Sequence, residues 1–160
     1  MKRLTAFAAA ALFAIATPAL ALPNFGARAG FTSGPDQIHL GAHAEVIELS
    51  PGLVFLPSVE VGLGDNQTLW ALNGELVWAV DRAEWRSWRP YVGGGLGIFI
   101  VSFDLPDAPP GFDDSRTDVG LSVLVGVSKL LNLGHKFFAE VKIGLEDAPD
   151  VKVTAGLTFF

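Results

Sequence analysis

Apolar and polar residues alternate along most of this chain after residue 21. A period of two is typical of β-strands, because successive side chains point to opposite faces. The alternating segments are separated by short stretches rich in Gly, Pro, Asn and Asp, which favour turns. The pattern therefore predicts eight strands, at 25–33, 37–49, 53–64, 68–80, 88–103, 116–131, 136–146 and 151–160.

Segment 116–131 illustrates the alternation: Val119, Leu121 and Val123 fall on one face, and Gly120 and Ser122 on the other. Segment 88–103 is so rich in Gly and apolar residues that its phase cannot be assigned. A strand that crosses a bilayer needs about 9–11 residues, so eight strands and their turns fit a chain of 160 residues. The predicted fold is all-β, an eight-stranded antiparallel up-and-down transmembrane β-barrel.

The two faces differ in side-chain size, and this difference predicts which one lies inside. The polar face is full of Gly, Ser, Ala and Thr, which suit the narrow interior of an eight-stranded barrel. The other face carries bulky apolar residues, as a band facing lipid requires. We therefore expect the polar face inside and lipid outside, with a soluble periplasmic lipocalin-like barrel of inverted faces as the alternative.

Aromatic residues are expected to gather at one end of the barrel, as a girdle at a membrane interface does. If the chain starts on the periplasmic side, the periplasmic ends of the strands carry Phe25, Phe55, Trp78, Trp88, Tyr91, Phe137 and Phe159. The chain also stops on Phe160, and a terminal Phe after an amphipathic strand is the usual ending of bacterial outer-membrane barrels. Phe160 is one position out of phase with the apolar face of segment 151–160.

The start of the chain has the pattern of a secretory signal peptide. Lys2 and Arg3 precede an apolar run from Leu4 to Leu20, and Ala19-Leu20-Ala21 has the form of a cleavage site. We expect residues 1–21 to be removed near Ala21, and residues 22–160 to form the barrel in the bacterial outer membrane.

Composition excludes several classes of function. Without Lys2 and Arg3, the 17 acidic residues outnumber nine of the 11 basic ones, and such an acidic protein repels nucleic acid. The absence of Cys excludes disulfides and thiolate metal sites. We expect no cofactor and no metal. The loop 104–115 is acidic and rich in Pro, and it is predicted to be a solvated loop outside the cell.

Two stretches resemble small outer-membrane β-barrel proteins of the OmpA/OmpX type. Residues 89–97, with the sequence RPYVGGGLG, are similar to one strand of these proteins, and residues 138–145 with 153–159 are similar to their last hairpin. The resemblance implies a monomeric barrel with a filled interior and both termini in the periplasm. It also implies outer-membrane lipid and the barrel-assembly machinery as partners.

Charged and histidine side chains on the predicted inner face form the candidate site of this chain. Charges inside a narrow barrel must pair, because burying an unpaired charge is costly. We therefore interpret the set as a structural polar network filling the lumen, although mixed charges could also line a narrow polar path or an ion gate. The set consists of Arg28, His39, His43, Glu45, Glu60, Glu75, Glu140, Lys142 and Lys152.

Histidines in segment 37–49 raise the question of catalysis or metal binding. His39, His43 and Glu45 share one face of a strand, which permits a metal site or a hydrolytic dyad. However, His39 and His43 are about 13 Å apart along an ideal strand, too far for one metal ion. No catalytic residues and no metal ligands are predicted.

The leading hypothesis is a structural or interaction role in the cell envelope, without enzymatic activity. One alternative is OmpW-like passage or binding of small hydrophobic molecules, with segment 88–103 as the only apolar candidate for the lining of a tunnel. An enzyme acting on lipid is a further alternative. The sequence specifies neither a ligand nor a physiological partner.

Overall fold

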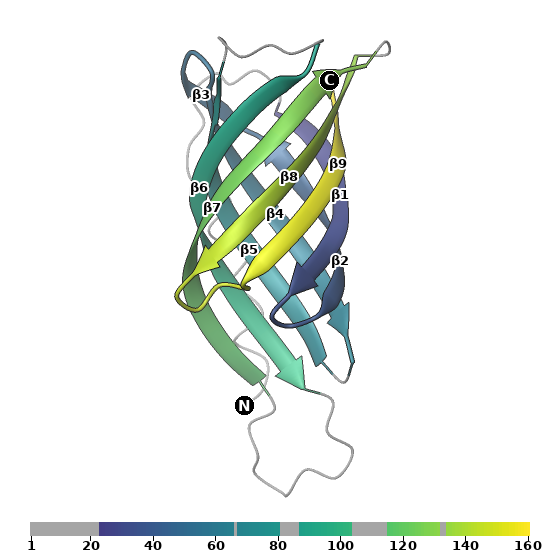
Figure 1. Ribbon diagram of the computed structural model, residues 1–160, viewed down its shortest axis with the longest axis vertical. Helices are drawn as coiled ribbons and strands as arrows, with labels where there is room; N and C mark the ends of the chain where they lie inside the picture. The colour runs from purple at the N-terminus through teal and green to yellow at the C-terminus, as the bar shows by residue number, and fades with distance from the viewer. Residues whose placement is uncertain (1–22, 66, 81–86, 104–114, 132–133) are drawn as a thin grey trace, which may run out of the picture.

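The computed structural model describes residues 23–65, 67–80, 87–103, 115–131 and 134–160 (Figure 1). These residues form strands β1 (Asn24–Ser33), β2 (Gln37–Glu45), β3 (Ile47–Ser50), β4 (Leu53–Gly64), β5 (Gln67–Ala79), β6 (Arg89–Phe103), β7 (Ser115–Leu130), β8 (His135–Leu145) and β9 (Val151–Phe159). No helix among the described residues is long and apolar enough to cross a membrane.

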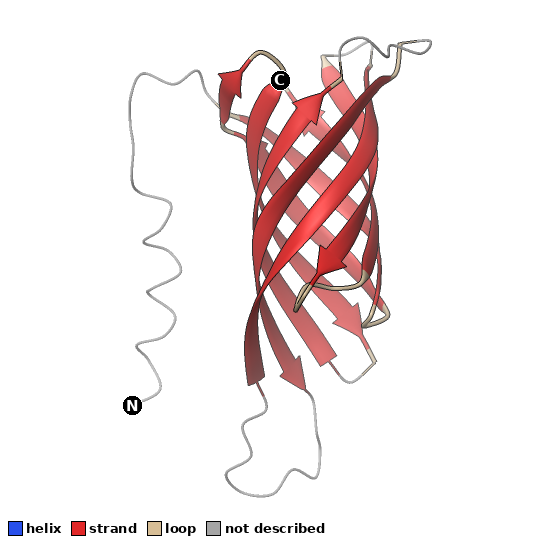
Figure 2. Cartoon of the chain, turned by 60° about the vertical axis from the view of Figure 1, so that its left-hand side comes forward, coloured by secondary structure: helices blue, strands red, loops and turns tan. Residues whose placement is uncertain are grey.

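All strand pairs are antiparallel, and the sheet closes on itself. Strands β4 to β9 pair in chain order, β9 then pairs with β1, and β1 with β2. The pairing of β2 with β4 closes the barrel, and the short β3 extends the edge of β4. Figure 2 shows the tilted strands of this closed wall. The structure confirms the predicted eight-stranded antiparallel up-and-down barrel.

The two ends of the barrel hold different parts of the chain. At the terminal end, β1 begins and β9 finishes, and β3 lies at this end too (Figure 1). At the loop end, the chain turns from β1 to β2 at residues 34–36 and from β8 to β9 at residues 146–150. The predicted loop 104–115 falls largely on residues 104–114, which lie outside the described residues, as does the predicted signal at 1–21.

The predicted single segment 37–49 is in fact two strands separated by a β-bulge. From His43 to Ile47 the chain advances four residues, while the facing β4 advances only three, from Phe55 to Ser58. An extra residue reverses the alternation of side chains that follow it. As a result His43 points inward, whereas Ile47 and Leu49, which have the same parity, are exposed on the outside.

The inner and outer faces are distributed as the sequence pattern predicts. Buried side chains inside the barrel are largely polar or charged, whereas bulky apolar side chains cover the outside. The exposed group includes Ile38, Leu40, Leu63, Trp70, Leu96, Val119, Leu121, Val123, Val125, Ile143 and Val153. The barrel is therefore largely polar on its inner face and apolar on its outer face.

Strand β6, whose phase the sequence left open, alternates cleanly in the structure. Tyr91 and Phe99 are buried inside the barrel, while Val92, Leu96 and Ile98 are exposed outside. The prediction that Tyr91 belongs to the outer aromatic girdle is therefore wrong. Its hydroxyl can hydrogen-bond within the polar interior, which gives the ring a partner that the outer face lacks.

Other aromatic residues of the predicted girdle do lie outside at the terminal end. Phe25, Trp78 and Phe159 are exposed there. Phe160 follows the last residue of β9, so its side chain does not belong to the alternation of that strand. The centroid of its ring instead lies 5.8 Å from Lys136 Nζ.

Candidate functional site

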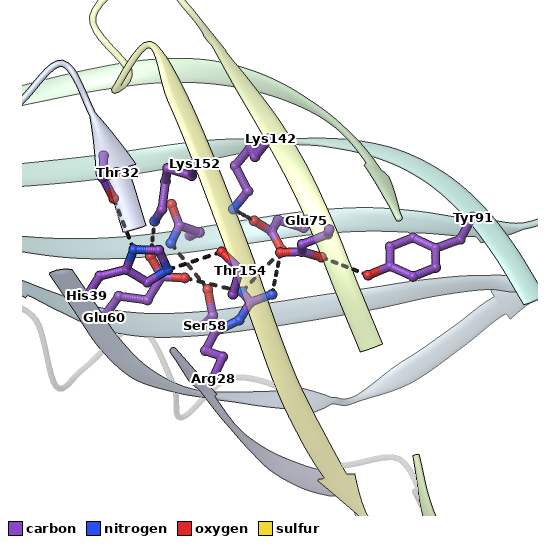
Figure 3. Close-up of polar contacts among 12 residues, drawn as sticks. Arg28, Thr32, His39, Ser58, Glu60, Glu75, Tyr91, Lys142, Lys152 and Thr154 are labelled. Atoms are coloured by element: carbon purple, nitrogen blue, oxygen red, sulfur yellow. Dashed lines mark hydrogen bonds and ion pairs between the residues drawn. The ribbon is translucent and has the colours of Figure 1, made fainter. Parts of the chain in front are cut away.

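The buried guanidinium of Arg28 is the centre of the barrel interior. Arg28 extends from β1, and its Nη2 donates a hydrogen bond of 2.7 Å to Glu140 Oε1 on β8. Its Nη1 lies 3.3 Å from Glu60 Oε1 and 3.6 Å from Glu75 Oε2, on β4 and β5. One cation therefore contacts carboxylates from three strands across the lumen (Figure 3).

Each of these carboxylates has a second partner. Lys152 on β9 donates to Glu60, and Lys142 on β8 donates to Glu75. The third, Glu140, accepts a hydrogen bond of 2.9 Å from the hydroxyl of Tyr91 on β6. Arg28, Glu60, Glu75, Glu140, Lys142, Lys152 and Tyr91 are hereafter called the ion network.

The ion network is electrically balanced, because three basic and three acidic side chains meet within it. All six are buried, with Glu75 only 1% exposed. Charges taken out of water are tolerated only when paired and hydrogen-bonded, and leaving one partner alone is costly. The arrangement joins six strands, β1, β4, β5, β6, β8 and β9, through side chains.

The two candidate histidines hydrogen-bond threonines and not each other. His39 lies between Thr32 and Thr154, at 3.0 and 3.1 Å from their hydroxyl oxygens. The Nε2 atom of His43 is 3.0 Å from the Thr158 hydroxyl. Among the described residues, no group of three or more His, Cys, Asp or Glu side chains could hold a metal ion.

Glu45 lies apart from the ion network, near the terminal end. It accepts a hydrogen bond from Lys136 on β8, and both side chains keep some contact with solvent. The remaining eight residues of the predicted polar set are buried inside the barrel. The set thus divides into a central network, two histidine contacts and a pair close to the mouth.

A small apolar cluster fills the interior toward the loop end. Leu69, Ala71 and Phe99 pack there with Ala148, which belongs to the turn between β8 and β9. This turn folds into the mouth because Gly120 leaves space for it: a Cβ on Gly120 would lie 2.4 Å from the Ala148 nitrogen. Phe99, the buried apolar residue that β6 contributes to this cluster, therefore fills the interior at this end and does not line a tunnel.

A cavity of about 90 Å³ lies inside the barrel between the ion network and the terminal end. Val54, Leu56 and Val77 form part of its apolar wall, and Arg28 and Glu140 also contribute to its lining. Its size is sufficient for only a few water molecules, since water occupies about 30 Å³ per molecule in the liquid.

Sequence reasoning missed several members of this interior. Lys136 lies at the start of β8, where the pairing with Glu45 was not predicted. Tyr91 was assigned to the outer face because the phase of its strand was unknown. The glycine at position 126 on β7 is the signal that could have revealed the inward position of Tyr91. The Tyr91 ring packs over Gly126, and a Cβ there would lie 2.4 Å from the ring.

No protein-family model matches this sequence, and no curated protein does. Solved structures, in contrast, share its fold. Neisserial surface protein A is 18% identical with a TM-score of 0.62, and the match covers 86% of this chain and 94% of that one. The N-terminal β-barrel domain of Pseudomonas aeruginosa OprF is 13% identical with a TM-score of 0.64, over 86% and 95% of the two chains.

The Yersinia pestis outer membrane protein Ail, in a phospholipid bilayer nanodisc, is also similar. It is 10% identical with a TM-score of 0.52, over 86% of this chain and 98% of that chain. At these identities the likeness establishes the architecture alone. This chain therefore has the fold of the small eight-stranded outer-membrane barrels.

Proposed function

We propose that this protein is a bacterial outer-membrane β-barrel with a sealed interior, serving the cell envelope as a structural or interaction protein and not as a pore or an enzyme. The single observation that carries this proposal is the distribution of side chains. Bulky apolar residues cover the outside, and a balanced ion network occupies the inside.

The outer face supports a membrane location. A soluble barrel of this size would bury its bulky apolar residues and expose its charges, whereas this one does the reverse. A continuous apolar surface of such extent is unstable in water and suits the hydrocarbon region of a bilayer. The terminal end then lies in the periplasm, which agrees with the predicted export signal.

The inner face supports a sealed barrel. Eight strands enclose a lumen only just wide enough for side chains. Here the apolar cluster at Phe99 and Ala148 packs in the interior toward the loop end, and the ion network around Arg28 crosses the middle. The filled loop end also disfavours an internal tunnel for hydrophobic molecules entering from outside.

Fractionation of cells that express the full-length chain tests the membrane location. Each fraction is run on SDS gels with and without boiling. We expect the protein in the outer membrane, with a folded band that changes mobility on boiling. A soluble periplasmic protein without a mobility change would overturn the proposal.

A second function, binding of small hydrophobic molecules, is favoured by one observation. A hollow of about 300 Å³ lies on the apolar outer face, beside Pro57. It is reached from the side of the barrel and not through the mouth, so binding there needs no internal tunnel.

A further inference from the structure

The wall of the barrel has one irregular seam, between β2–β3 and β4. Pairing stops at His43 and Ser58 and resumes at Ile47 and Phe55. Two residues lie between these pairs on β4, Leu56 and Pro57, and Pro57 has no N–H to donate to a neighbouring strand. At the other seven seams, the residue pairs among the described residues run without a break.

The hollow lies at this seam. Its lining includes outward side chains of β1, β2, β4 and β5, and it is almost wholly apolar. The outward group is Phe25, Ala42, Ala44, Pro57, Val59 and Leu72. The small side chains of Ala42 and Ala44 leave this part of the apolar surface recessed.

Two inward-facing residues also reach the hollow, His43 and Ser58. His43 is only 3% exposed, and it lines the interior cavity as well. Its Nε2 faces Thr158, but its Nδ1 has no hydrogen-bond partner among the described residues. A buried polar atom without a partner carries a desolvation cost, which a ligand that supplies a partner removes.

We propose that this seam binds a single-chain amphiphile with an uncharged hydroxyl head, a proposal that rests on the membrane location proposed above. The hydrocarbon chain occupies the hollow, and the head reaches His43. A hydroxyl both donates and accepts hydrogen bonds, so it satisfies Nδ1 in either tautomer of the imidazole.

Charge excludes the other head groups. The ion network beside His43 is already balanced, and Glu45 is paired with Lys136. An anionic or cationic head would bring an uncompensated charge into a region of low dielectric constant. A fatty alcohol is therefore preferred to the fatty acid of the same length.

The test uses the folded full-length barrel in phosphatidylcholine vesicles. A long-chain alcohol with a photoreactive diazirine in its chain is added, and labelled peptides are mapped by mass spectrometry. We expect labelling concentrated on the strands around Ala44 and Pro57, well above that of Val123 and Val125 on another part of the outer face. Equal labelling at all of these positions would show bulk partitioning only and overturn the proposal.

Variants distinguish the binding of the hydrocarbon chain from that of the hydroxyl head. Ala44→Phe fills the hollow and should abolish the excess labelling, whereas Ala155→Phe, at an outward alanine elsewhere, should not. His43→Leu should lower labelling by the alcohol about three- to tenfold, as the loss of one hydrogen bond predicts, and leave labelling by the matching alkane unchanged. His39→Leu controls for the loss of a buried imidazole.

Gel mobility before boiling shows whether each variant is folded, and Ala42→Phe replaces Ala44→Phe if the latter fails to fold. Unchanged labelling in a folded Ala44→Phe or His43→Leu variant would contradict the proposed site. If no outward residue is labelled, including Val123, the membrane location itself is wrong, and the proposal falls with it.

Discussion

Arg28 on β1 and Glu140 on β8 are 112 positions apart in the sequence and form a hydrogen bond of 2.7 Å in the middle of the barrel. Strand β9 lies between β1 and β8 in the wall, so this contact connects strands that are not neighbours. The same guanidinium also contacts Glu60 and Glu75. We regard this residue as the main internal link of the fold.

Arg28→Met should strongly destabilise the barrel. It leaves three buried carboxylates with only two lysines and one tyrosine hydroxyl as partners. Removing one partner of a buried ion pair costs about 3–5 kcal/mol. The measurement is the free energy of unfolding by urea in lipid vesicles, followed by tryptophan fluorescence. Arg116→Met, which removes an exposed ion pair with Asp118, should have a much smaller effect; equal effects would refute the role of Arg28.

Lys152 and Glu60 should show strong energetic coupling, because they pair within the buried network. Each single change to Met leaves an uncompensated charge, whereas the double variant Lys152→Met and Glu60→Met keeps the network balanced. We expect the double variant to be more stable than either single variant. A double-mutant cycle measured by urea unfolding checks this, and strictly additive effects would argue against a coupled pair.

Tyr91→Phe should reduce stability without altering the shape of the barrel. The substitution removes the hydroxyl that donates to Glu140 and leaves the ring beside Gly126. A hydrogen bond to a charged group contributes about 1.5–3 kcal/mol. The same unfolding measurement applies, and a loss close to zero would mean that Tyr91 only fills space.

Val123→Arg should impair insertion, because Val123 lies outward near the middle of β7. An arginine facing the middle of a bilayer costs about 2–4 kcal/mol, and this cost falls toward the interface. Val119→Arg, nearer the loop end, should therefore be milder. Folding yield into vesicles, read from gel mobility, tests both. Normal insertion of both variants would contradict the assignment of faces.

The fold was predictable because alternation survives in almost every strand. Side chains of period two, such as Val119, Leu121 and Val123 against Gly120 and Ser122, record the two faces directly. Strand β6 was the exception, because glycines and bulky apolar residues occur on both of its faces, so neither side-chain size nor polarity distinguishes them. Its phase became clear only from its partners, since Tyr91 pairs with Gly126 in register.

The candidate site was predictable as a set of residues but not as a set of contacts. The parity of Arg28, Glu60 and Glu140 indicates their common face. The tilt and stagger of the strands determine which of them meet, and no single segment encodes these. The bulge before Ile47 was also missed. Ile47 and Leu49 are apolar but have the same parity as the polar His43. Such a change of pattern within one segment is a signal of an extra residue.

A sealed barrel is the central claim, and conductance across a planar lipid bilayer tests it most directly. Folded protein is added at increasing amounts, with a known porin as the control for insertion into the same membranes. We predict no steady conductance above the background, because the ion network and the apolar cluster fill the lumen. A steady, voltage-independent current that grows with the amount of inserted protein would contradict the claim.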